Sequence, residues 1–334
     1  MKANAKQMSF SAASVFPAKL LKMKVIDDKG RVMPIHLQIN PTNVCNFNCP
    51  FCSCANRNKG LQLSYEDHKE ILEKAVKHGC KSVTITGGGE PLMHPKISEI
   101  IKLCSNLGIK VGLVSNGMLL SKLNREDMER ITWCRISSSD YLEENLKTIN
   151  KTLDDWFNII DGAVKIGSDV DWAFSHVLTK NARCDILAKC IDFANKHNFT
   201  HIRIVSDLLD LDNVPDMELV KKILREQLKV DDHLVIYQGR KDHVRGRKKC
   251  LISLLKPVIG PDGKIYPCCG TQYALENPSK DYEKTMNMGD AKDIDKLFEE
   301  QKFFDGSVCV KCYYEQYNYA LEVITSEVKH KEFV

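Results

Sequence analysis

Strong charge of one sign and long apolar runs are both missing from this sequence. Its 48 basic and 44 acidic residues leave a net charge of only +4, so charge alone gives no reason to expect a nucleic-acid partner. No apolar stretch approaches the about 20 residues that a membrane-spanning helix needs, so we expect no membrane insertion. With 43% hydrophobic and 28% charged residues, the composition is that of a folded globular protein.

Internal repeats, low-complexity segments and a convincing export signal are missing as well. The apolar stretch from Met8 to Phe16 is too interrupted for a signal peptide, and we therefore expect a cytoplasmic location. The length of 334 residues suits one large α/β domain with a smaller domain attached to it.

Strand-like and helix-like segments alternate regularly over the first two thirds of the chain. Helical spacing of apolar residues is clearest after Ser64, whose position three residues before Asp67 predicts the start of a helix. Such alternation predicts a parallel sheet flanked by helices, and about six units predict a partial (β/α)6 barrel. Ligands of such barrels gather where the strands end. The strand-like runs cover residues 35–40, 82–86, 110–115, 132–137, 170–178 and 201–205.

Cysteine is abundant, with fourteen copies in the chain. Disulfides rarely persist in a reducing cytosol, so this abundance predicts metal ligands or redox groups. Cys45, Cys49 and Cys52 lie on one loop after the first strand-like run and can face a single metal centre. Two sites fit this spacing: a structural zinc ion with Cys54 as fourth ligand, or a [4Fe–4S] cluster with three protein ligands and one open iron.

Three motifs follow one another, each at the end of a strand-like run. The first is the Cys45–Cys52 loop, with Phe51 directly before its last cysteine. The second is Gly87-Gly88-Gly89-Glu90-Pro91, and the third is Ser115-Asn116-Gly117. Together they resemble the signature of the radical S-adenosylmethionine (radical SAM) superfamily over about residues 33–240.

The resemblance implies a role for each motif. The three cysteines would hold a [4Fe–4S] cluster whose open iron chelates S-adenosylmethionine. The backbone of Gly88 and Gly89 would approach the methionine amine closely, and Glu90 would accept a hydrogen bond from it. Cleavage of the sulfonium would then give a 5′-deoxyadenosyl radical, which is chemistry of the cofactor. The other expected contacts are Phe51 near the adenine, and Ser115, Asn116 and Ser137 near the ribose or carboxylate.

A second group of cysteines follows residue 240. The turn at Pro261-Asp262-Gly263 predicts a β-hairpin between them. On spacing alone, structural zinc and a fully ligated [4Fe–4S] cluster fit this group equally. The pattern resembles the shortened, one-cluster "twitch" form of the SPASM extension of many radical SAM enzymes, over about residues 250–315, which implies one auxiliary cluster. Its expected ligands are Cys250, Cys268, Cys309 and Cys312.

Cys269 directly follows one of these expected ligands. In some radical SAM epimerases a cysteine in such a place donates a hydrogen atom to the substrate radical, so the resemblance makes Cys269 a candidate catalytic residue. The alternative is a packed spare thiol. The sequence predicts buried apolar thiols at Cys80, Cys104, Cys134, Cys184 and Cys190.

The expected organisation is an N-terminal extension over residues 1–32, a radical SAM barrel over 33–240, and a small β-hairpin/helix auxiliary-cluster domain over 241–334. The expected reaction removes a hydrogen atom from an unactivated C–H bond. A two-electron oxidation through the auxiliary cluster or an epimerisation would follow. The enzyme would need two [4Fe–4S] clusters, S-adenosylmethionine and an external one-electron donor such as flavodoxin or ferredoxin.

The expected substrate is a small molecule, with a ribosomal peptide as the alternative. It would be anionic if the basic run over residues 240–249 is a binding patch rather than a solvated linker. A non-enzymatic iron–sulfur electron carrier or zinc-stabilised binding protein would explain the cysteines. It would not explain Gly88, Gly89 and Glu90 at the end of a strand.

Overall fold

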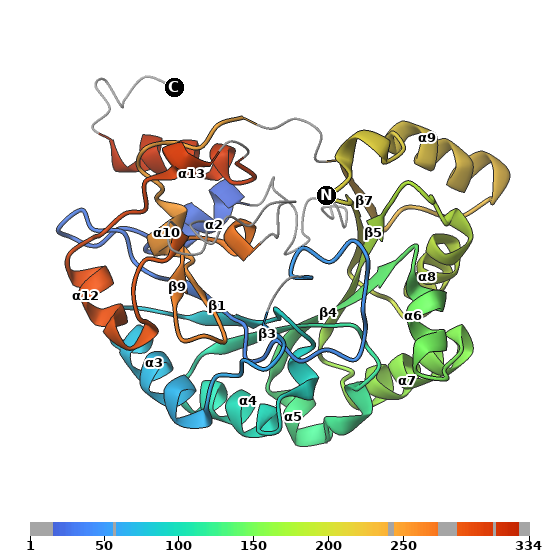
Figure 1. Cartoon of the computed structure of the whole chain (residues 1–334), viewed down its shortest axis with the longest axis horizontal. Helices are drawn as coiled ribbons and strands as arrows, with labels where there is room; N and C mark the ends of the chain where they lie inside the picture. The colour runs from blue at the N-terminus through green and yellow to red at the C-terminus, as the bar shows by residue number, and fades with distance from the viewer. Residues whose placement is uncertain (1–15, 56–57, 240–243, 273–285, 310–311, 327–334) are drawn as a thin grey trace.

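The computed structural model describes residues 16–55, 58–239, 244–272, 286–309 and 312–326. Figure 1 shows a curved sheet with helices along its outer side and the C-terminal elements against one end of it. Among the described residues, no helix is long and apolar enough to cross a membrane.

Seven parallel strands lie side by side in chain order and form the partial barrel. The predicted α/β fold with a parallel sheet is confirmed, and all six strand-like runs are strands. One further parallel strand, β7, lies beside β6 and had no counterpart among the predictions. The strands are β1 (His36–Ile39), β2 (Ser82–Ile85), β3 (Lys110–Ser115), β4 (Ile131–Ser139), β5 (Asp171–Leu178), β6 (His201–Ser206) and β7 (Val235–Gln238).

The helices between these strands start and stop where local chemistry requires. The Ser64 hydroxyl accepts a hydrogen bond from the backbone N–H of Asp67 at 3.0 Å, as the capping pattern predicts. Gly79 follows the same helix with a φ of +101°, a conformation that favours glycine. The helices are α3 (Tyr65–Lys77), α4 (Ile97–Asn106), α5 (Arg125–Glu129), α6 (Leu142–Thr148), α7 (Leu153–Ile166), α8 (Cys184–Lys196) and α9 (Met217–Lys222).

The largest buried side chains fill the space between the sheet and these helices. Trp156 of α7 stacks on Phe174 of β5 with ring centroids 5.7 Å apart, and Phe174 lies 4.9 Å from Phe199. All three side chains are almost completely buried. This aromatic packing fixes α7 and α8 against the outer face of the sheet.

The C-terminal segment extends the same sheet. Strand β8 (Val258–Ile259) pairs in parallel with β1, and β9 (Ile265–Tyr266) pairs antiparallel with β8. The predicted hairpin is therefore present, with Gly263 at a φ of +72° in its turn. The expected domain boundary near residue 240 falls within 240–243, outside the described residues, and stays a prediction. The remaining helices are α2 (Phe16–Lys22), α10 (Ile252–Leu255), α12 (Ile294–Glu299) and α13 (Glu315–Thr325).

Candidate active site

Cys45, the first cysteine of the loop, lies six residues beyond the end of β1, where the parallel strands terminate. The thiols of Cys45, Cys49 and Cys52 are all half-buried. Burial, together with the charges of Cys52 and Cys45, raises the pKa of Cys49 to about 12. Three thiols that repel one another as thiolates suit a cationic metal centre, because the metal makes deprotonation favourable.

Asn145, on α6, connects the helical layer to this loop. Its side-chain N–H donates to Cys49 Sγ at 3.3 Å, and its Oδ1 accepts from the backbone N–H of Asn48 at 3.1 Å. Sequence reasoning did not find Asn145, because no local motif relates it to a cysteine 96 residues away.

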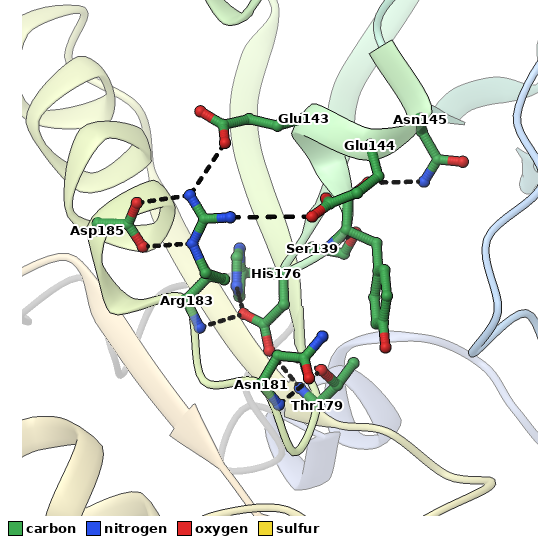
Figure 2. A network of polar contacts seen from close by, with 11 residues as sticks. Ser139, Glu143, Glu144, Asn145, His176, Thr179, Asn181, Arg183 and Asp185 are labelled. Atoms are coloured by element: carbon green, nitrogen blue, oxygen red, sulfur yellow. Dashed lines mark hydrogen bonds and ion pairs between the residues drawn. The ribbon is translucent and has the colours of Figure 1, made fainter. Parts of the chain in front are cut away.

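A polar network holds α6 in place (Figure 2). Arg183 pairs with Glu143 of α6 at 3.0 Å and with Asp185 of α8 at 2.7 Å. The buried carboxylate of Asp140 accepts from His176 Nε2 at 3.0 Å and from the backbone N–H of Arg183 at 3.1 Å. Because these contacts tie the start of α6 to β5 and α8, the position of Asn145 is well determined.

The glycine motif packs directly against the cysteine loop. The backbone N–H of Gly89 donates to Thr42 O at 2.9 Å, and that of Glu90 donates to Val44 O at 2.8 Å. A Cβ atom on Gly89 would lie 2.0 Å from Val44 O, so only glycine fits here. The two motifs are therefore joined backbone to backbone.

Glu90 lies at the centre of this arrangement, with a side chain 2% exposed. Its Oε1 accepts from Ser115 Oγ at 2.8 Å and from the backbone N–H of Leu92 at 3.1 Å. Its Oε2 accepts from the backbone N–H of Asn116 at 2.7 Å, which leaves that oxygen able to accept a further donor. Burial raises the pKa of Glu90 to about 7, against the effect of these hydrogen bonds.

Asn116 completes the connection between the three motifs. Its side-chain N–H donates to Asn46 Oδ1 at 2.7 Å, and its carbonyl accepts from Trp156 Nε1 at 2.8 Å. The structure thus brings the cysteine loop, Glu90 and the third motif together. Of the other expected contacts, Phe51 lies 6.2 Å from the Tyr141 ring, and Ser137 lies on β4 in register with Ser175.

The four cysteines of the second group line a single pocket. They come from separate parts of the C-terminal segment, and aromatic side chains such as Phe304 and Tyr314 share the lining. Burial raises the pKa of every one of these thiols. Sulfur-only ligand sets suit iron–sulfur clusters and zinc. The four are Cys250, Cys268, Cys309 and Cys312.

Backbone contacts hold this pocket closed. The backbone N–H of Cys312 donates to Val244 O at 2.8 Å, and that of Gly246 donates to Cys309 O at 2.9 Å. A Cβ atom on Gly246 would lie 2.2 Å from Gly306 O, so the two segments meet without room for a side chain. Among the described residues, neither group of cysteines contains three His, Cys, Asp or Glu side chains placed closely enough to bind a single metal ion.

Cys269 lies beside the pocket, outside its described lining. Its Sγ is 3.1 Å from the hydroxyl of Tyr314, and its thiol lies close enough to Lys256 to act on the pKa of that amine.

The five cysteines predicted as buried apolar thiols are all buried. In the basic run, Arg247 pairs with Glu315 of α13 at 2.6 Å and is therefore committed to the fold.

Comparisons with known proteins agree with this geometry. Residues 39–186 match the model of the Radical SAM superfamily. A probable GTP 3′,8-cyclase of Sulfurisphaera tokodaii is 27% identical over 272 residues, which cover 73% of this chain and 83% of the relative.

Solved structures agree in fold. Streptococcus suis SuiB bound to S-adenosylmethionine gives a TM-score of 0.55 at 18% identity, covering 93% of this chain and 77% of that chain. Native anSMEcpe with bound AdoMet and Cp18Cys peptide gives a TM-score of 0.55 at 14% identity, covering 89% of this chain and 84% of that chain.

Over residues 39–186 this chain is therefore similar to the radical SAM superfamily, and the solved structures share its fold. The family that residues 39–186 resemble is named for S-adenosylmethionine, and its enzymes bind that molecule on a [4Fe–4S] cluster. The types of donor present fit both groups: Cys45 and Cys52 lie close enough to act on the pKa of Cys49, and the glycine motif packs against their loop. The particular reaction and the auxiliary cluster go beyond this assignment.

Proposed function

We propose that this protein uses S-adenosylmethionine to remove a hydrogen atom from an unactivated C–H bond and then oxidises the substrate by two electrons. The observation that carries the proposal is the joining of three motifs at one end of the sheet. The Glu90 carboxylate accepts a hydrogen bond from the third motif, and its backbone N–H donates one to the start of the loop that carries Cys45 and Cys49. A structural metal site would not require a buried carboxylate at that junction.

In this proposal each group of residues has a separate role. Cys45, Cys49 and Cys52 hold the [4Fe–4S] cluster. Oε2 of Glu90 would accept from the methionine amine, beside the backbone of Gly88 and Gly89. The remaining contacts to the adenine, ribose and carboxylate come from Phe51, Ser115, Asn116 and Ser137. When bound, the cluster and S-adenosylmethionine supply a 5′-deoxyadenosyl radical.

The second pocket would hold an auxiliary [4Fe–4S] cluster. Its four thiols are the complete ligand set that such a cluster needs. Loss of one hydrogen atom leaves a carbon radical, and loss of a further electron and a proton completes the oxidation. The auxiliary cluster would accept that electron. An external donor such as flavodoxin or ferredoxin would supply the electron for the first cluster.

A second candidate is epimerisation, which the position of Cys269 favours. A thiol near the substrate donates a hydrogen atom: the S–H bond breaks and a new C–H bond forms. The sulfur radical then takes an electron from the external donor and a proton from water. The Tyr314 hydroxyl, 3.1 Å from Cys269 Sγ, would hold the thiol in position.

The names of similar proteins suggest substrate classes. The Sulfurisphaera tokodaii relative is a probable GTP 3′,8-cyclase, and the anSMEcpe structure contains a peptide. We propose an anionic small molecule, because the relative aligned over most of both chains is named for a nucleotide reaction. A peptide is the alternative.

Product analysis in deuterated water separates the two reactions. Oxidation gives a product two hydrogens lighter with no solvent deuterium on carbon, and Cys269→Ala then changes turnover little. Epimerisation gives a product of unchanged composition with one deuterium on carbon, and Cys269→Ala then stops turnover after hydrogen abstraction. A deuterated product without net oxidation would refute the oxidation proposal.

A further inference from the structure

An asparagine of α13 contacts one cysteine of the second pocket. The side chain of Asn318 is 1% exposed and belongs to the lining of that pocket. Its side-chain N–H donates to Cys250 Sγ at 3.7 Å, and its Oδ1 accepts from the backbone N–H of Ile252 at 3.0 Å. A backbone N–H can only donate, so its partner must be the amide oxygen of Asn318. The amide nitrogen therefore faces the sulfur.

The first cysteine loop has the same arrangement. Asn145, 5% exposed, donates to Cys49 Sγ at 3.3 Å and accepts from the backbone N–H of Asn48 at 3.1 Å. In both places a buried amide comes from a helix outside the cysteine segment. It donates to one sulfur and accepts from a backbone N–H within two residues of that cysteine. Because the arrangement occurs at both groups of cysteines, it indicates a role at the sulfur rather than in packing alone.

Arg247 holds α13 against the second pocket. Its guanidinium pairs with Glu315 at 2.6 Å and with Glu322 at 2.6 Å. Glu315, Asn318 and Glu322 are three and four residues apart, so they share one face of the helix. The ion pairs therefore lie on either side of Asn318 along that face. Figure 2 shows that Arg183 contacts α6 through carboxylates in a similar way.

The backbone of Cys250 is fixed independently of its sulfur. Its N–H donates to Phe304 O at 3.1 Å, and its carbonyl accepts from the Ser253 hydroxyl at 2.6 Å. The same hydroxyl accepts from the backbone N–H of Phe304 at 3.2 Å. The hydrogen bond from Asn318 differs from these contacts, because it reaches the sulfur itself.

A hydrogen-bond donor beside a sulfur favours added negative charge on it. In iron–sulfur proteins, hydrogen bonds to the sulfurs help to set the potential of the cluster. We propose that Asn318 is a positioning residue of the second pocket, which holds the Cys250 sulfur and makes a cluster bound there easier to reduce. The inference rests on the proposed function, because that function needs a cluster in this pocket that accepts an electron.

A purely structural role of Asn318, through Ile252 at the start of α10, is the alternative. Two substitutions distinguish the roles. Asn318→Asp keeps an oxygen for the Ile252 N–H but has no amide N–H for the sulfur, whereas Asn318→Leu loses both contacts. A structural role predicts that Asn318→Leu lowers stability and that Asn318→Asp leaves the potential unchanged.

The test is a redox titration, followed by electron paramagnetic resonance, of the reconstituted variant in which Cys45, Cys49 and Cys52 are changed to Ala. In this variant the signal comes from the second pocket. Adding Asn318→Asp should shift the ratio of oxidised to reduced cluster at fixed potential about 3- to 10-fold toward the oxidised form, which is about 30–60 mV for one electron. Asn318→Leu should shift it in the same direction. Gln316→Glu adds the same charge at an exposed position of α13 and should change the ratio less than about twofold.

Iron counting and urea unfolding of each variant accompany the titration. Loss of iron from folded Asn318→Asp would also support the proposal, because Cys250 would then no longer be held as a ligand. Full iron with an unchanged potential overturns the proposal. So does an equal shift in Gln316→Glu, or failure of both Asn318 variants to fold.

The same measurements separate this inference from the proposed function. A triple-alanine variant without iron refutes the auxiliary cluster, and with it the proposed oxidation and the role of Asn318. An unchanged potential in Asn318→Asp refutes the role of Asn318 alone. A lowered potential in Asn318→Asp, with a natural protein that fails to cleave S-adenosylmethionine, refutes the proposed function and leaves the role of Asn318 standing.

Discussion

At the scale of single residues, Asn145 is the contact that sequence reasoning had no means to find. Its N–H···S hydrogen bond to Cys49 favours a more negative sulfur, and hydrogen bonds to the sulfurs help to set a cluster's potential. We predict that Asn145→Leu lowers the midpoint potential of the first cluster by about 20–60 mV, the equivalent of about 0.5–1.5 kcal/mol.

A redox titration followed by electron paramagnetic resonance measures that shift. Asn213→Leu, in the turn after β6, is the control and should leave the potential unchanged. An unaltered potential in Asn145→Leu with full iron content would show that the contact does not act on the cluster.

At the scale of elements, the glycine motif depends on a close backbone approach. A Cβ atom on Gly89 would overlap the Val44 carbonyl, so Gly89→Ala must displace one of the two loops. We predict a loss of stability of about 1–3 kcal/mol. Weaker S-adenosylmethionine binding should accompany it. Gly162→Ala, in α7, has no atom within 4 Å of the added Cβ and should stabilise the protein by about 0.5–1 kcal/mol.

Urea unfolding and a binding titration of both variants check this expectation. Equal stability of Gly89→Ala and the natural protein would mean that the loops are not packed as described.

The helices and strands also show which features of the fold are determined by the local sequence. Six strands and the α3 cap follow from apolar spacing, glycine breaks and a serine three residues before an aspartate, all of which are local. The pairing of β8 with β1 joins Gln38 to Val258, a distance in sequence that no local pattern spans. Asn318 was visible in the sequence, but its contact with Cys250 depends on the packing of α13, which only the structure provides.

At the scale of the whole molecule, buried histidines predict sensitivity to acid. Burial lowers the pKa of His68 to about 4, below the ordinary value of about 6.5. The folded chain therefore keeps this imidazole neutral while the unfolded chain binds a proton, and stability falls as the pH drops below 6.5. The contribution of His68 is about 2–3 kcal/mol between pH 7 and pH 4.5.

His68→Gln should reduce the pH dependence of stability by that amount, measured by urea unfolding at the two pH values. Glu90, whose pKa burial raises to about 7, acts in the opposite direction, but its effect is common to both proteins and cancels. Identical pH dependence in the two proteins would contradict the assignment.

The central claim for the molecule is that the first cysteine loop supports radical cleavage of S-adenosylmethionine. Its most direct test is quantification of 5′-deoxyadenosine after anaerobic reconstitution and reduction with dithionite, together with iron counting. The account predicts product from the natural protein and from Cys54→Ala. It predicts none from the variant with Cys45, Cys49 and Cys52 all changed to Ala, which should also lose about four irons. Undiminished 5′-deoxyadenosine formation by that triple variant would contradict the account.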